Sequence, residues 1–246
     1  MIRHKKTRPK DKSVSAADQA YSGIMDLVLG HGLRPGERTS VNLLSAKLGL
    51  GRTPVKEAIT RLQTEGLLSV AGRSGTVVNQ IDRERTEHLF ALRQVLEGFA
   101  AEEAARKVTS DQLQKIRDLL QEMKVYSSAQ ANIQAAASFV RANVAFHSLI
   151  VAAAGNPILD RFYAQLQMQF QIVTYLVQRG YNPQAAERRQ KEHEAIAKAL
   201  AARDGKMLKQ ALKSHAQATE ATILETLESV LPRPAARGQA RRRKSA

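Results

Sequence analysis

The sequence predicts a mainly α-helical protein, with an N-terminal winged helix-turn-helix followed by a C-terminal all-α helical bundle. Two short helical patterns lie on either side of Gly49, and a glycine-containing strand pair follows them. From about residue 82 onward, long helical periodicities continue without any strand pattern. Aromatic residues make up only 4% of the 246 residues, while Ala, Leu, Gln and Glu are abundant, and this composition favours helices.

Positive charge is concentrated at the two ends of the chain. The formal net charge is +15, and residues 1–12 and 232–246 together hold twelve Lys or Arg side chains against one acid. We therefore expect disordered basic tails over 1–14 and 232–246, which either raise non-specific affinity for polyanions or are simply solvated. High charge alone is then weak evidence for specific DNA binding.

Cysteine content and hydropathy indicate in which cellular compartment the protein is expected. The chain has no cysteine, which excludes disulfides and thiolate metal sites. No apolar run reaches the roughly 18 residues of a membrane span, and no apolar signal segment follows the basic N-terminus. These features predict a cytoplasmic protein that has no membrane partner.

The winged pattern occupies residues 15–79, and residues 80–83 are the expected linker to the second domain. The expected elements are helices over 40–48 and 52–65 and strands over 67–71 and 75–79. Ser40 can cap the first of these helices, and Gly49 permits the sharp turn between them. Three leucines of the first helix are expected to face inward: Leu43, Leu44 and Leu48.

The first turn of the second helix carries candidate DNA-reading side chains. An α-helix fits the major groove, where its first residues reach base edges and phosphates. Arg52 is the foremost candidate because its planar fork can pair with guanine, while Thr53 and Lys56 suit phosphates or single base contacts. Gly72 and Arg73 at the hairpin tip can enter the minor groove or touch the backbone. The alternative is a packing motif with solvated basic residues.

The second domain is expected over residues 84–231 as six antiparallel helices joined by short connections. Helical periodicity and breaks at Gly, Asn and Pro give the approximate ranges 82–107, 109–127, 131–154, 157–179, 184–203 and 205–230.

The N-terminal domain resembles the GntR-type bacterial transcription regulators in three segments, which lie at 35–37, 51–58 and 62–68. The segments read Pro-Gly-Glu, Gly-Arg-Thr-Pro-Val-Lys-Glu-Ala and Leu-Gln-Thr-Glu-Gly-Leu-Leu. The resemblance covers 33–78 and implies DNA binding, with Asn42 close to the DNA backbone. Gly51 replaces a small hydroxyl residue of the family and Lys56 replaces an arginine, so the half-site sequence of the family does not transfer directly.

The C-terminal half resembles the fatty-acid-regulator-like (FCD) branch of the same family, in its six-helix form. The residues that carry this resemblance are Leu92, Arg93, Leu96, Glu97, Asn143, Phe146, His147, Gly155, Asn156, Pro157, Glu192, His193 and His215. In the resembled domain, an aspartate and histidines hold a divalent metal, which binds a carboxylate effector together with an arginine. The corresponding arginine is Arg93, and the aspartate position is Asn143.

The same residues can be read from their chemistry. Asn143 and His147 are four residues apart and share one helical face, while His193 and His215 come from two further helices. Imidazoles suit a divalent ion such as zinc or nickel, although Asn143 supplies no charge and therefore weakens the site. Alternatively, the histidines are hydrogen-bonded core residues or bind an organic acid directly, and Arg93 pairs internally with Glu97.

These features predict a ligand-responsive transcription regulator, and not an enzyme. We expect a homodimer on a near-palindromic double-stranded DNA operator, a small carboxylate effector in the bundle, and repression by blocking polymerase. The glutamates lie on exposed-looking helix faces, and no paired Glu-x-x-His motifs occur, which argues against catalysis. The competing hypotheses are a metal-dependent helical enzyme with an accessory DNA-binding head, and an architectural nucleic-acid binder driven by the tails.

Overall fold

The computed structural model describes residues 14–29, 32–71, 75–79, 82–128, 133–177 and 183–230. The chain divides into two compact units, Met1–Gln80 and Ile81–Ala246. Among the described residues, the first unit holds a small sheet and three helices and the second holds helices only, so the predicted mainly α-helical class is confirmed. No helix within the described ranges combines the length and apolar character needed to cross a membrane.

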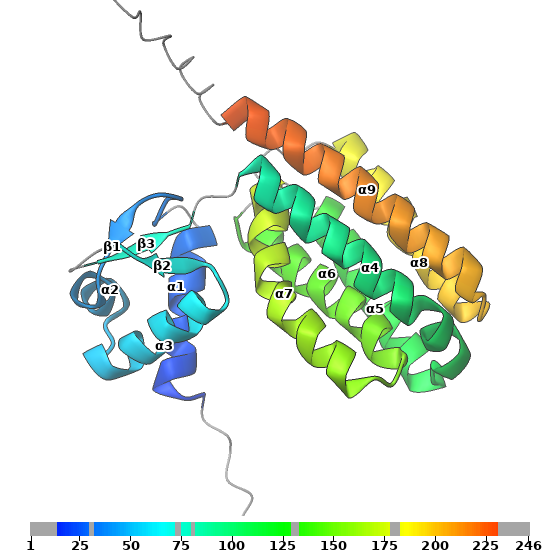
Figure 1. Cartoon of the computed structure of the whole chain (residues 1–246), viewed down its shortest axis with the longest axis horizontal. Helices are drawn as coiled ribbons and strands as arrows, with labels where there is room; N and C mark the ends of the chain where they lie inside the picture. The colour runs from blue at the N-terminus through cyan, green and yellow to red at the C-terminus, as the bar shows by residue number, and fades with distance from the viewer. Residues whose placement is uncertain are drawn as a thin grey trace, which may run out of the picture. The chain divides into compact units, whose positions relative to one another are not determined.

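The first unit packs three helices against a three-stranded antiparallel sheet (Figure 1). The helices are α1 (Ala16–Leu29), α2 (Val41–Leu48) and α3 (Arg52–Thr64), and the strands are β1 (Arg38–Thr39), β2 (Leu68–Val70) and β3 (Thr76–Val78). The strand order is β1-β3-β2, with Thr76 opposite both Thr39 and Val70. Strand β1 was not predicted, because two residues are too few to show an alternating pattern.

Local chemistry sets the turn between α2 and α3. The Ser40 hydroxyl accepts a hydrogen bond from the Leu43 backbone N–H, and Gly49 ends α2 with φ of 66°, a left-handed conformation that favours glycine. The expected inward position of Leu43 is wrong, since its side chain is 41% exposed whereas Leu44 is buried. Successive helical residues are rotated by about 100°, so a helix as short as α2 cannot bury both neighbours under one face.

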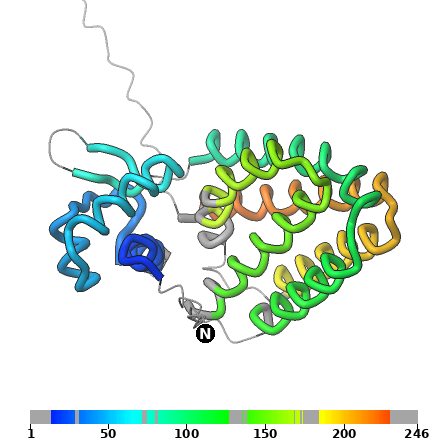
Figure 2. The backbone as a smooth tube through the Cα atoms, turned by 90° about the horizontal axis from the view of Figure 1, so that it is seen from below, coloured from blue at the N-terminus to red at the C-terminus, as the bar shows by residue number. Residues whose placement is uncertain are grey.

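Six helices form the second unit, in agreement with the expected number and order. They are α4 (Arg83–Lys107), α5 (Ser110–Ser128), α6 (Ile133–Ala153), α7 (Pro157–Val177), α8 (Pro183–Ala201) and α9 (Gly205–Val230). Helices α4 and α7 lie along one side of the bundle and α5 and α8 along the opposite side, with α6 and α9 between them (Figure 2). Side chains from α6 and α9 therefore meet those of the outer helices in the bundle interior.

The connection between α8 and α9 fixes both helices against α4. Arg203, which has a positive φ of 56°, donates hydrogen bonds to the carbonyls of Ala105, Arg106 and Val108 at the end of α4. These bonds satisfy carbonyl groups that a helix end leaves unpaired. Two residues later α9 begins at Gly205, where a Cβ atom would lie 2.8 Å from Cα of Glu102.

We expect Gly205→Ala to destabilise the protein by about 1–3 kcal/mol, because the new methyl group meets backbone that cannot move away without separating α9 from α4. Thermal or urea unfolding measures the change. Gly98→Ala in the middle of α4 is the matched control, since its Cβ would meet only the Lys209 side chain at 3.7 Å. The control should gain roughly 0.5–1 kcal/mol from helix propensity. Equal stabilities for the two variants would contradict close packing at Gly205.

Candidate functional site

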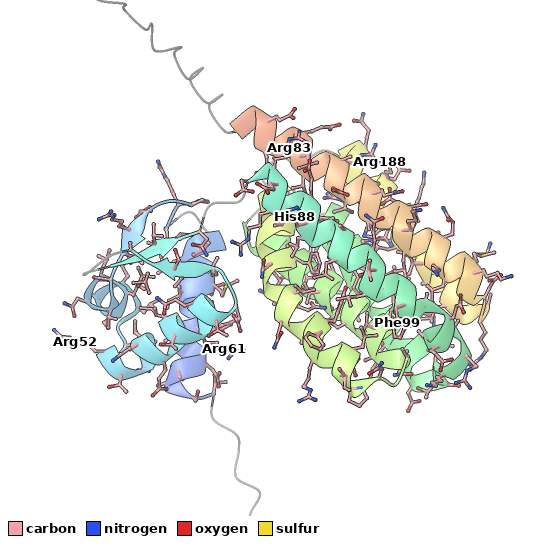
Figure 3. The ribbon with its side chains drawn as sticks, viewed as in Figure 1. Arg52, Arg61, Arg83, His88, Phe99 and Arg188 are labelled. Atoms are coloured by element: carbon pink, nitrogen blue, oxygen red, sulfur yellow. The ribbon has the colours of Figure 1, made fainter. Side chains whose placement is uncertain are left out.

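The predicted DNA-reading side chains of α3 are all exposed. Val55 and Ala58 hold the inner face of the helix in the core, which leaves Arg52, Thr53 and Lys56 on the outer face of its first turn. Figure 3 shows Arg52 projecting outward from the start of α3. The helix N-terminus itself, with its unpaired N–H groups, adds partial positive charge that favours phosphate.

The remaining predicted DNA contacts on this unit are Asn42, Gly72 and Arg73. Asn42 lies exposed in the first turn of α2. Gly72 and Arg73 lie outside the described residues. Gly51 is the N-cap of α3 and makes no side-chain hydrogen bond, as its lack of a side chain requires.

The other end of α3 is tied to α1 by a polar cluster that the sequence did not reveal. The guanidinium of Arg61 lies 4.0 Å above the Tyr21 ring, and the Tyr21 hydroxyl donates a 2.8 Å hydrogen bond to Glu65. Arg61 also forms ion pairs with Glu65 and Asp18. This cluster joins the C-terminal half of α3 to α1.

The bundle interior brings the three predicted histidines together. The buried histidines are His147 from α6, His193 from α8 and His215 from α9. Each offers one ring nitrogen, and the three nitrogen atoms lie within 4.8 Å of one another. The His147 and His215 rings are stacked with centroids 5.1 Å apart, and the His193 centroid lies 4.5 Å from that of His215. Oδ1 of Asn143, one turn before His147, accepts a 2.9 Å hydrogen bond from Nε2 of His193.

A buried carboxylate lies at the edge of this cluster. Oε1 of Glu97 accepts hydrogen bonds from Arg93 at 2.9 Å and from the Tyr163 hydroxyl at 2.5 Å, and Nδ1 of His147 lies 3.1 Å away. Arg93 therefore forms the internal ion pair that its spacing allowed. The expectation of exposed glutamates is wrong for Glu97, which is 1% exposed because these partners compensate its charge.

Two polar residues orient the histidine rings from outside the cluster. Oε2 of Glu192 lies 2.9 Å from Nδ1 of His215, and Asn143 holds Nε2 of His193. Such second contacts determine which ring nitrogen carries the proton and which is free to act as a ligand. Tyr163 and Glu192 were absent from the predicted site. Only the position of Glu192 beside His193 signals its role, and no local pattern signals Tyr163.

Burial determines the ionisation of the cluster. Loss of hydration lowers the pKa of His193 and of His215 well below the usual value, and it also lowers the pKa of His147. Burial alone would raise the pKa of Glu97, but the charge of Arg93, together with the polar contacts from His147 and Tyr163, outweighs it and the pKa is lowered. The histidines are thus neutral beside an ionised carboxylate, and neutral imidazole is the form that binds metal.

Several buried atoms of the cluster lack hydrogen-bond partners among the described residues. They are both ring nitrogens of His147, Nδ1 of His193, Nη2 of Arg93 and Oε2 of Glu97. Buried polar atoms are rarely left unpaired in native proteins, so these atoms are suited to contact a ligand. Neutral imidazoles with unpaired nitrogens fit a divalent metal, and the unpaired guanidinium nitrogen fits an anion beside it.

Comparison with known proteins agrees with the two-unit architecture. Residues 16–78 match the family of bacterial regulatory proteins called the gntR family, and residues 88–218 match the FCD domain. The FCD match alone extends over more than half of the 246 residues.

Individual relatives are also transcription regulators. The Nta operon transcriptional regulator of Aminobacter aminovorans is 33% identical over 96 residues, which is 39% of this chain and only 46% of that protein. LutR of Bacillus subtilis is 28% identical over 202 residues, covering 74% of this chain and 90% of LutR. The fold is similar to that of Escherichia coli McbR/YncC, with a TM-score of 0.74 at 22% identity over 87% of this chain and 99% of that one.

A second solved structure concerns the C-terminal unit by itself. The metal-free FCD domain of TM0439 aligns with a TM-score of 0.51 at 21% identity, covering 61% of this chain and 99% of that domain. Both units therefore have counterparts among regulators, and the relatives named here are not enzymes. The chain belongs to the GntR family of bacterial transcription regulators, as a member with an N-terminal DNA-binding helix-turn-helix and a C-terminal FCD domain for a small-molecule effector.

Proposed function

We propose that this regulator binds a near-palindromic operator as a homodimer, and that an acidic metabolite held by a divalent metal in the bundle controls this binding. The observation that carries the proposal is the buried cluster of three neutral histidines beside Arg93, with unpaired nitrogen atoms directed to no protein partner within the described residues. A cluster of this kind has no structural use for its unpaired atoms, but it suits a metal and an anion.

For the metal, we propose that His147, His193 and His215 are the principal ligands and that Asn143 contributes its amide oxygen. Asn143 is neutral, so the ion retains both of its charges after these residues have bound it. A bound divalent ion supplies a fixed positive charge that attracts a carboxylate. Arg93 can add a hydrogen bond through Nη2, which Glu97 leaves unpaired.

On the DNA side, we propose that Arg52 reads a base, that Thr53, Lys56 and Asn42 contact the backbone or an adjacent base, and that Gly72 and Arg73 act from the wing. Support comes from the exposed first turn of α3 and from the charge of its N-terminus. One such helix reads only a few base pairs, so two-fold symmetry is needed for an operator of useful specificity.

An apolar surface on α4 and α7 is the proposed dimer contact. Both helices expose large apolar side chains: Leu92, Val95 and Phe99 on α4, and Ile158 and Phe162 on α7. The three on α4 follow helical spacing along one face, and Figure 3 shows Phe99 on the side of α4 that faces the viewer. Exposed apolar surface of this kind is typical of protein–protein contacts, and a second copy would bury it symmetrically.

The effector would act by binding one arrangement of the dimer more tightly than another. A ligand that favours neither arrangement changes nothing, however tightly it binds. We propose repression as the direction of control, with polymerase blocked while the operator is occupied. In vitro transcription from a template that carries the operator tests the direction, and activation on protein addition would contradict repression.

Arg52→Ala should weaken binding to the specific operator by about 1–3 kcal/mol, or roughly 5- to 150-fold, because a bidentate base contact is lost. Fluorescence anisotropy with operator and random duplexes measures this change. Arg106→Ala is the matched control, since Arg106 is exposed on α4 and pairs only locally with Glu103. If Arg52→Ala and Arg106→Ala bind the operator as the wild type does, α3 does not read bases through Arg52.

His193→Ala should abolish metal binding, whereas His88→Ala should not, because His88 is exposed on α4 (Figure 3). Elemental analysis of protein purified without a histidine tag should find about one zinc- or nickel-like ion per chain in the wild type. At metal concentrations about 100-fold above Kd, binding adds about 2.7 kcal/mol and should raise the wild-type Tm by about 5–10 °C. The proposed coordination would be ruled out if His193→Ala kept its full metal content. It would also be ruled out if the wild type held no metal and still bound the effector.

Phe99→Glu should convert the dimer to a monomer, because two carboxylates would face each other across a two-fold contact that is otherwise apolar. Sedimentation measures the mass, and circular dichroism checks the fold. Val125→Glu on α5 is the control, since Val125 is also an exposed apolar residue but lies on the opposite side of the bundle. A monomeric Val125→Glu together with a dimeric Phe99→Glu would place the contact elsewhere.

A further inference from the structure

A second arginine, Arg189, lies near the histidine cluster and is not one of the site residues predicted from the sequence. Arg189 is on α8, four residues before His193, so both side chains lie on the same face of the helix. The guanidinium carbon lies 5.6 Å from the centroid of Phe139, whose ring lies 6.5 Å from that of His193. Phe139 therefore adjoins both the arginine and the cluster.

The charge of Arg189 is not balanced by a direct contact. Its Nε atom is shielded from solvent and has no hydrogen-bond partner among the described residues, and none of their carboxylates forms an ion pair with it. Glu192, three residues further along α8, is engaged by His215 at 2.9 Å. Arg189 is half-buried, and the aromatic face of Phe139 compensates its guanidinium only in part. An anion beside Arg189 would complete its surroundings.

The summed charge of the proposed metal site also calls for an anionic ligand. Arg93 and Glu97 cancel each other, and Arg189 and Glu192 on α8 add one charge of each sign, so within the described ranges these four charges sum to zero. The histidines and Asn143 are neutral. The two positive charges of a bound divalent ion are then left uncompensated. A buried net charge is unfavourable in free energy unless a ligand neutralises it. A ligand with two negative charges meets this condition, whereas a monocarboxylate leaves one positive charge.

We propose that Arg189 binds a second acidic group of the effector and so makes the site selective for dianionic acids, such as dicarboxylates, over monocarboxylates. One acidic group lies at the metal and Arg93, and the other pairs with the guanidinium of Arg189. This proposal rests on the proposed effector site and assigns its ligand class and a specificity-determining residue.

The test uses the full-length, zinc-loaded protein and two matched sets of probes. Succinate, glutarate and adipate are compared with butyrate, pentanoate and hexanoate by calorimetric titration, which pairs each diacid with a monoacid of equal carbon number. We expect at least one diacid to bind about tenfold or more tightly than its matched monoacid, since a charge-assisted bidentate contact is gained.

Two variants locate the effect. Arg189→Gln should remove the preference for the diacid by weakening diacid binding, while the monoacid still binds. Arg188→Gln is the matched control, because Arg188 is the neighbouring arginine on α8 and is exposed (Figure 3). It should retain the preference. Arg189→Lys keeps the charge but loses the planar fork, and it should show an intermediate preference, which decides the matter if Arg189→Gln does not fold.

The outcomes separate the two proposals. If diacids and monoacids bind equally, or if Arg189→Gln and Arg189→Lys keep the full preference, the role of Arg189 is overturned while the effector site stands. If neither set of acids binds the zinc-loaded wild type, the carboxylate effector site itself fails, and the role of Arg189 fails with it.

Discussion

The buried carboxylate of Glu97 is the group on which the interior of the helical unit depends. Its Oε1 atom contacts Arg93 on its own helix, Tyr163 on α7 and His147 on α6, so one oxygen joins three helices. Removing either member of a buried ion pair leaves an uncompensated charge and costs about 3–5 kcal/mol. The pair therefore holds the helices in register and also keeps one charge of each sign permanently beside the histidines.

This fixed pair determines what the histidine cluster can do. Because Arg93 and Glu97 neutralise each other, the cluster has no surplus negative charge that would keep the imidazoles protonated, and burial lowers their pKa values. Neutral rings cannot hold an anion by charge, so in the proposed site a divalent ion links them to a carboxylate. Because Asn143 is an amide, it would leave the full charge of that ion available to the ligand.

The sequence predicted those features that depend on neighbouring residues. Ser40 and Gly49 define the turn before α3 through their own hydroxyl and conformational freedom, and helix breaks define the bundle. Burial of Glu97 could not be predicted in the same way, because it depends on Tyr163, which lies 66 residues away. Leu43 was placed inward because a run of leucines does not show which of them a short helix buries. The histidines were found because helical spacing and a family resemblance agreed.

In the proposed operator complex, the N-terminal unit has few side chains with which to read bases, and this has a consequence for control. Gly51 offers no side-chain oxygen at the start of α3, and Lys56 provides charge without a bidentate fork, so in the proposed complex base discrimination falls mainly on Arg52. In the proposed dimer each half then binds weakly, and tight binding requires both halves at once. Linked weak sites lose most of their affinity when geometry prevents simultaneous contact. A small change in the bundle can therefore switch operator binding without altering α3 itself.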